Sequence, residues 1–126
     1  MALTAPRRVL LLGTENSDGT VTGVITGQSI PLDTLGMSLT TVYLRSVGTT
    51  SGGTVLVETA DWGPLETVYS GTWATIATIL ASSFTGGAQT QVAISPSALR
   101  FLRVRISSPI TGGGTILASA VQQGTA

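Results

Sequence analysis

Residues that favour turns recur along the whole chain at short intervals, and this close spacing of turns limits the possible folds more than any other feature. Clusters of Gly, Asn, Asp, Ser and Pro separate short segments that are rich in Val, Ile, Leu and Thr. β-Branched residues between such turns are typical of short strands, and the spacing leaves little room for long helices. The sequence therefore predicts an all-β fold, a single antiparallel β-sandwich or jelly roll of about eight strands.

Alternation of apolar and polar residues indicates which side of each strand faces the core. It is clearest near the C-terminal end, where Leu102, Val104 and Ile106 alternate with Arg103 and Arg105. Successive side chains of a strand point to opposite faces, so one face carries aliphatic groups and the other carries guanidinium groups. The same pattern predicts inward rows in three other segments, formed by Val42, Leu44, Val55, Val57, Ile116, Ala118 and Ala120.

Residues 73–84 allow two interpretations. Trp73, Ile76, Leu80 and Phe84 are spaced as on one face of a helix. The segment is nevertheless rich in β-branched Thr and Ile, which favour extended structure. We expect a strand here, with a short helix as the alternative.

The chain has 126 residues, enough for one domain that buries about two thirds of its surface. We expect a single domain over residues 1–126, with loose arms at 1–6 and 122–126. The longest uninterrupted apolar run, Val9–Leu12, is far shorter than the roughly 20 residues of a membrane span, and the start lacks a signal-peptide core. No membrane partner is therefore expected. Because the strand expected at residues 7–12 is apolar on both faces over Val9–Leu12, we expect the second sheet to cover one face and a neighbouring subunit the other.

Lys, His and Cys are absent, and their absence removes more chemistry than any motif supplies. Without them the chain has no imidazole base, no thiolate nucleophile, no Schiff-base amine and none of the commonest zinc ligands. We therefore expect no enzymatic activity, no cofactor and no metal site. Six Arg balance six Asp plus Glu. A neutral chain without a basic cluster is not expected to bind nucleic acid.

Carboxylates are the groups that remain for catalysis. Glu58 and Asp61 are close in sequence, and a glycosidase needs two facing carboxylates. Glu58, however, falls on the outward row of its strand, where we expect it to pair with Arg103 or Arg105. Asp61 precedes a Trp-Gly-Pro turn, so its expected role is to stabilise that turn.

Charged residues make up only 10% of the chain, whereas about 25% is usual for a globular domain. Thr, Ser and Gly must therefore supply much of the surface. Such an exterior suits a protein that is packed against other subunits. A domain with a neutral polar surface is the alternative.

Three stretches resemble small β-sandwich structural proteins of tailed bacteriophages. In residues 51–61 a strand ends on an acidic residue before a turn, in 70–76 a glycine precedes Trp73, and in 99–116 a strand with alternating arginines leads to a glycine turn. The resemblance implies a jelly-roll-like capsid decoration, or cement, protein. It implies a homotrimer bound to the major capsid protein at the virion surface, after synthesis in the host cytoplasm. The expected partner contacts are Val9, Leu10, Leu11, Leu12, Arg103 and Arg105.

A carbohydrate-binding β-sandwich of a phage tail, collar or head appendage is the alternative. Such a module stacks sugar rings on exposed aromatic side chains. Trp62 lies beside a Gly-Pro turn and Tyr69 follows soon after. We expect these two residues to form the stacking surface in that case.

Overall fold

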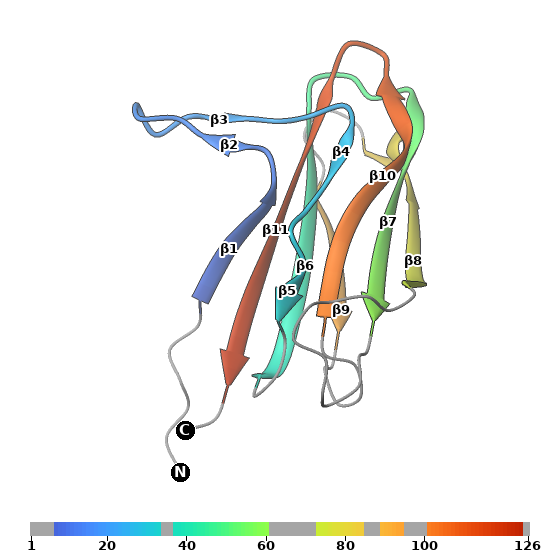
Figure 1. Ribbon diagram of the computed structural model, residues 1–126. Helices are drawn as coiled ribbons and strands as arrows, with labels where there is room; N and C mark the ends of the chain where they lie inside the picture. Colours follow the sequence, from blue (N-terminus) through green and yellow to red (C-terminus); the bar gives the residue numbers. More distant parts are fainter. Residues whose placement is uncertain (1–6, 34–36, 61–72, 85–88, 95–100, 125–126) are drawn as a thin grey trace.

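The computed structural model describes residues 7–33, 37–60, 73–84, 89–94 and 101–124, and these form an all-β fold (Figure 1). Besides strands, the described residues include one short 3-10 turn. The elements in chain order are β1 (Arg7–Leu12), β2 (Thr14–Glu15), β3 (Val21–Thr22), β4 (Gly27–Gln28), β5 (Leu32–Asp33), β6 (Met37–Val47), β7 (Gly52–Ala60), β8 (Ala74–Leu80), η1 (Ala81–Ser83), β9 (Gln89–Ile94), β10 (Phe101–Thr111) and β11 (Thr115–Gly124).

Two antiparallel sheets form the sandwich. One has the order β1-β11-β6-β9, and the other has β4 and β5 at one edge, followed by β10, β7 and β8. Since β4 and β5 pair with different parts of β10, they share one strand position in their sheet. Over the described residues each sheet then has four strand positions, eight in all, and β2 and β3 form a separate hairpin. In chain order, the first position, β1, pairs with the last, β11, and the second, β4–β5, pairs with the seventh, β10. The third, β6, pairs with the sixth, β9, and the fourth, β7, pairs with the fifth, β8. This pairing is the winding of a jelly roll, and the fold-class prediction is confirmed.

The core lies between the two sheets and contains the inward rows that alternation predicts. Leu44, Val57, Val104 and Ile116 are completely buried, and they come from four different strands. Removal of these aliphatic groups from water is the main force that holds the sheets together. The whole predicted inward set is buried: Val42, Leu44, Val55, Val57, Leu102, Val104, Ile106, Ile116, Ala118 and Ala120.

Residues 74–80 form a strand, as their β-branched content predicts, and η1 turns the chain directly after it. The Thr50 hydroxyl ties this turn to the rest of the fold. Its oxygen lies 2.8 Å from the carbonyl oxygen of Ala81 and 3.0 Å from that of Phe84. Because Thr50 is buried, these contacts satisfy polar groups that water does not reach.

The C-terminal arm begins later than the sequence predicts. The expected loose arm at 122–126 is wrong for residues 122–124, since β11 continues to Gly124. The side chain of Gln122 is buried, and its amide nitrogen donates a hydrogen bond to the carbonyl oxygen of Asp33 at 3.1 Å. A buried amide is tolerated once it is hydrogen-bonded. Residues 125–126 and the expected arm at 1–6 lie outside the described residues.

Candidate functional site

A charged cluster lies on the outer face of the sheet that contains β7 and β10. Glu58 of β7 is directly opposite Arg103 of β10. Its Oε1 accepts hydrogen bonds from Nε of Arg103 and from Nε of Arg105, both at 2.9 Å, and its Oε2 accepts one from Nη2 of Arg105 at 3.2 Å. The predicted pairing of Glu58 with Arg103 or Arg105 is confirmed, and both arginines take part in it.

The electrostatics of this cluster favour an ionised carboxylate. The hydrogen bond from Arg105 is the largest influence and holds the pKa of Glu58 below its ordinary value; burial opposes this, and Arg103 adds to the lowering. The guanidinium of Arg103 also lies 4.3 Å from the centroid of the Trp73 ring, a cation–π contact. A carboxylate held ionised by two cations is a poor general acid, so the arrangement serves to join β7 to β10.

The apolar run Val9–Leu12 divides between three environments. Val9 and Leu11 are half-buried and pack against the core, and Leu12 is itself a core residue with 4% of its surface exposed. Leu10 points to the other side of β1, where it lines a groove on the outer face of the sheet. Val9, Leu10 and Leu11 are therefore the members of the run that retain exposed surface.

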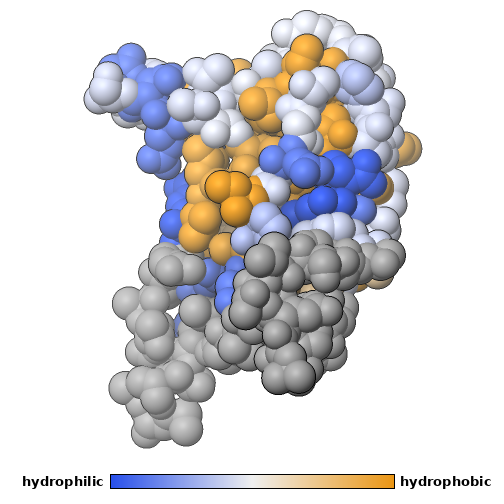
Figure 2. Space-filling view, viewed as in Figure 1, coloured by the Kyte–Doolittle hydropathy of each residue, from blue (hydrophilic) through white to orange (hydrophobic). Residues whose placement is uncertain are grey.

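One side of the sandwich, between β1 and the β4–β5 edge, leaves apolar groups exposed. Val9 and Leu11 of β1 pack against the core but are only half-buried, and so is Val24, which bridges to Ile116 of β11. Ile25 and Ile30, which flank β4, are 49% and 85% exposed. Figure 2 shows hydrophobic residues gathered here, between the hydrophilic β2–β3 hairpin and hydrophilic residues on the opposite flank. We refer to these five residues as the open side.

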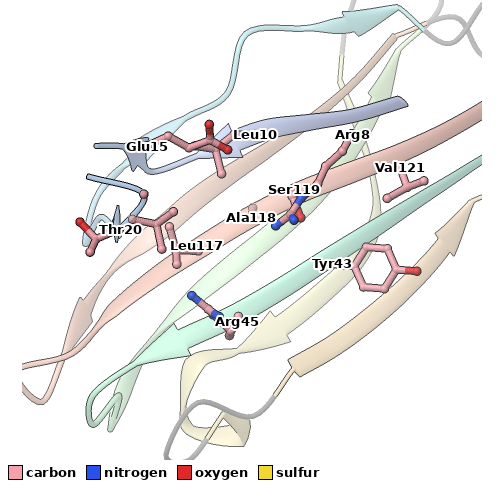
Figure 3. A pocket seen from close by; sticks show the side chains of 12 residues that line it. Arg8, Leu10, Glu15, Thr20, Tyr43, Arg45, Leu117, Ala118, Ser119 and Val121 are labelled. Atoms are coloured by element: carbon pink, nitrogen blue, oxygen red, sulfur yellow. The ribbon is translucent and has the colours of Figure 1, made fainter. Parts of the chain in front are cut away.

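A groove of about 660 Å³ lies on the outer face of the β1-β11-β6 sheet (Figure 3). Its floor follows β11, where Ser119 lies between Leu10 of β1 and Tyr43 of β6 in the strand register. A small residue between two larger ones makes the face concave at this point. Leu117 and Val121 continue the floor on either side of Ser119.

The β2–β3 hairpin closes one end of the groove, and a glycine directs it there. Gly13 has φ of +114°, a backbone conformation that residues other than glycine rarely adopt, and a Cβ at this position would collide with the side chain of Leu117. The chain leaves β1 at this glycine and turns over the sheet face. Glu15, Thr20 and Val21 of the hairpin then line the groove.

Hydrogen bonds within the hairpin fix the shape of its tip. The backbone nitrogen of Asn16 donates to the carbonyl oxygen of Thr20 at 2.8 Å, and the Asn16 side-chain amide donates to the hydroxyl oxygens of Thr20 and Thr22 at 3.0 Å. Asp18 accepts from the hydroxyl and the backbone nitrogen of Thr20, at 2.6 and 3.0 Å. The side-chain bond from Thr20 is the main reason why the pKa of Asp18 lies below its ordinary value.

Arg8 and Arg45 line the groove from opposite strands. Figure 3 shows Arg8 reaching over β11 toward Ser119 and Arg45 at the other side of the floor. Sequence reasoning did not select these two arginines or Tyr43, because their strands are far apart in the chain. The signal that was present is outward alternation in 41–47, where Tyr43 and Arg45 flank buried Leu44.

Trp62 and Tyr69, the remaining predicted site residues, lie outside the residues that the structure describes, and so does Asp61, whose expected role is to stabilise a turn. Over the described ranges, no three His, Cys, Asp or Glu side chains come together in a way that would hold a metal ion. Nor does that part of the chain include a helix of the length and apolarity that crossing a membrane requires.

Comparison with known proteins does not place the chain in a family. No family model matches its sequence, and no curated protein is detectably similar to it. A jelly roll supports many unrelated functions, so the argument for function depends on the surfaces described above.

Proposed function

We propose that this chain is a non-enzymatic structural protein of a phage particle, a capsid decoration subunit that binds the major capsid protein and copies of itself. It acts as a homotrimer on the virion surface after synthesis in the host cytoplasm. Its contribution is interface burial, which stabilises the assembled head. The resemblance of its turns and strands to small phage β-sandwich proteins supports this reading, as does the lack of imidazole, thiol and amine side chains.

The open side is the observation that carries the proposal. Apolar residues at the seam between the two sheets remain partly in water, and Ile30 is 85% exposed. Contiguous exposed apolar surface with a polar rim marks sites of protein association. Full burial of an exposed Ile side chain contributes about 1.5–3 kcal/mol. Ile25 and Ile30, with smaller contributions from the three half-buried residues, therefore give a contact with neighbouring copies a substantial apolar centre.

The proposed interface also includes charged residues beside the apolar residues of the open side. Arg103 and Arg105 are both held by Glu58, so their guanidinium groups are already oriented, and the one carboxylate compensates half of their charge. We assign them to the rim of the interface, where charges set orientation and specificity more than affinity. Repetition of the trimer over a capsid lattice multiplies contacts that are individually weak.

The test measures the mass of the protein in solution and its binding to capsids. Native mass spectrometry of the wild type is expected to show a trimer, and the protein is expected to co-sediment with empty capsids of the same phage. Ile30→Asp is expected to yield monomers and to weaken capsid binding at least tenfold, because burial of one isoleucine is worth about that factor or more. Leu80→Asp is the matched control, since Leu80 is also exposed, at 57%, but lies on β8.

One result would overturn the decoration role, and another would overturn the placement of the interface at the open side. A wild-type protein that stays monomeric and does not co-sediment with capsids at about 10 μM would refute the decoration role. If Leu80→Asp dissociates the trimer and Ile30→Asp leaves it intact, the open side is not the interface between copies.

A further inference from the structure

Positive charge is scarce in this protein, and the described arginines that form no ion pair with a described residue lie in the groove; the Glu58 cluster, with two arginines on one carboxylate, also keeps one uncompensated positive charge. The structure describes the side chains of four arginines, and two of them are bound to Glu58. The other two, Arg8 and Arg45, both line the groove, and neither forms an ion pair with a described residue. Glu15 contributes one negative charge at the hairpin end. The groove therefore has two guanidinium groups available for an anion.

The rest of the lining combines hydrogen-bonding groups with apolar surface. Ser119 and Tyr43 carry hydroxyls, which both donate and accept. Glu15 only accepts, and so does Thr20, because its hydroxyl proton is already donated to Asp18. Leu10 and Tyr43 stand on the two sides of Ser119 and offer apolar surface, including an aromatic ring. A ligand that matches this lining carries an anionic group, several hydroxyls and a compact apolar face.

The groove is also built in part from structure that is ordered without a ligand. Its floor is a strand with neighbours on both sides, and the tip of its overhanging hairpin is held by the hydrogen bonds of Asn16 and Asp18. Little conformational entropy is then lost on binding, which favours small ligands with modest contact area. Its volume of about 660 Å³ lies within the usual range of small-molecule sites.

We propose that the groove is a binding site for a carboxylated sugar, of the uronic-acid kind. A guanidinium matches the planar geometry of a carboxylate and binds it with charge-assisted hydrogen bonds. Sugar hydroxyls pair with Glu15, Thr20 and Ser119, and the apolar face of the ring lies against Tyr43. This site differs from the Trp62 and Tyr69 surface expected from the sequence, and it does not depend on the proposed capsid role.

The test uses a matched pair of probes that differ only in the carboxylate. D-galacturonic acid and D-galactose are each added to ¹⁵N-labelled protein at neutral pH, up to about 50 mM, well beyond a Kd of about 1 mM. Galacturonic acid is expected to shift the amide signals of residues 43–45 and 117–121 in a saturable manner. Galactose is expected to bind at least tenfold more weakly, because it lacks the charge-assisted bonds. Acetate and inorganic phosphate test for a site that accepts any anion.

Variants then locate the site. Arg45→Gln and Arg8→Gln are each expected to weaken galacturonic acid binding about tenfold. Arg105→Gln is the matched control, because it removes the same charge from the opposite sheet and is expected to leave sugar binding unchanged. The amide spectrum of each variant also reports whether it is folded, so loss of binding is separated from loss of structure.

Three results would overturn the proposal. One is the absence of saturable shifts with galacturonic acid, and another is equal binding of acetate, phosphate and the sugar. The third is binding of an extended peptide of alternating Leu and Asp in place of the sugar, which would make the groove a docking site for protein. Trimer formation and capsid binding are measured separately, so either proposal is able to fail without the other.

Discussion

Replacement of Glu58 by Gln tests whether the charged cluster stabilises the fold. The variant keeps the size of the side chain and one acceptor oxygen, but it removes the charge that faces Arg103 and Arg105. Three charge-assisted hydrogen bonds depend on that carboxylate. Removal of one partner of a fully buried pair costs about 3–5 kcal/mol. The Arg side chains here are 17% and 34% exposed, so solvent compensates them in part. We therefore expect a loss of about 2–3 kcal/mol.

Urea denaturation followed by circular dichroism measures this loss. At neutral pH the midpoint should fall without a change in slope, and the thermal midpoint should drop by roughly 10 °C for a domain of this size. Glu15→Gln is the control, because it makes the same chemical change at an exposed glutamate that forms no ion pair with a described residue. It should alter stability by less than about 0.5 kcal/mol.

The pH dependence of this stability loss tests whether the charge of Glu58 is its cause. Since the pKa of Glu58 is lower in the folded state than its ordinary value of 4.5, the stabilisation is present above that value and is lost as the pH falls through the folded-state pKa. The difference between wild type and Glu58→Gln should therefore shrink progressively as the pH is lowered below 4.5. Equal stability at neutral pH, or a difference that persists unchanged in acid, would show that the ion pairs do not stabilise the fold.

Two further substitutions test how the groove and the β8 turn are held. Gly13→Ala should destabilise the protein by about 1–3 kcal/mol in urea denaturation, because its φ is +114° and its Cβ would meet Leu117. Gly19→Ala, at φ of +87° but in open space, should cost less, and an equal cost would contradict the role assigned to Leu117. Thr50→Val should cost about 1–2 kcal/mol, because the carbonyl oxygens of Ala81 and Phe84 lose their hydroxyl partner. Faster hydrogen exchange at the Phe84 amide should accompany that loss, and unchanged exchange would count against a link between Thr50 and the turn.

The proposed subunit interface and the proposed sugar site lie on different surfaces of one sandwich. The open side is a seam between the sheets, where apolar groups of the core come to the surface. The groove lies on the outer face of one sheet, where Arg8 and Arg45 have no partner among the described residues. A subunit attached through its open side would leave this outer face available to a small ligand. The jelly roll itself decides neither function, since the fold serves many.

The fold class and the core-facing side of several strands were predictable from local sequence pattern. Alternation is a property of neighbours along the chain, so it correctly placed Leu44, Val57 and Val104 in the core. It also placed Glu58 and the two arginines on outward rows, and their opposite charges made pairing the expected outcome. Local pattern was sufficient because each of these conclusions depends only on which side of its own strand a residue occupies.

Which strands lie side by side could be learned only from the folded chain. The groove requires β1, β11 and β6 to be neighbours, and these come from the beginning, the end and the middle of the chain. The open side requires β1 to meet the β4–β5 edge, and the burial of Gln122 requires the carbonyl of Asp33 to lie next to it. Contacts between distant segments follow from the winding of the chain, which short-range periodicity does not encode, and both proposed sites consist of such contacts.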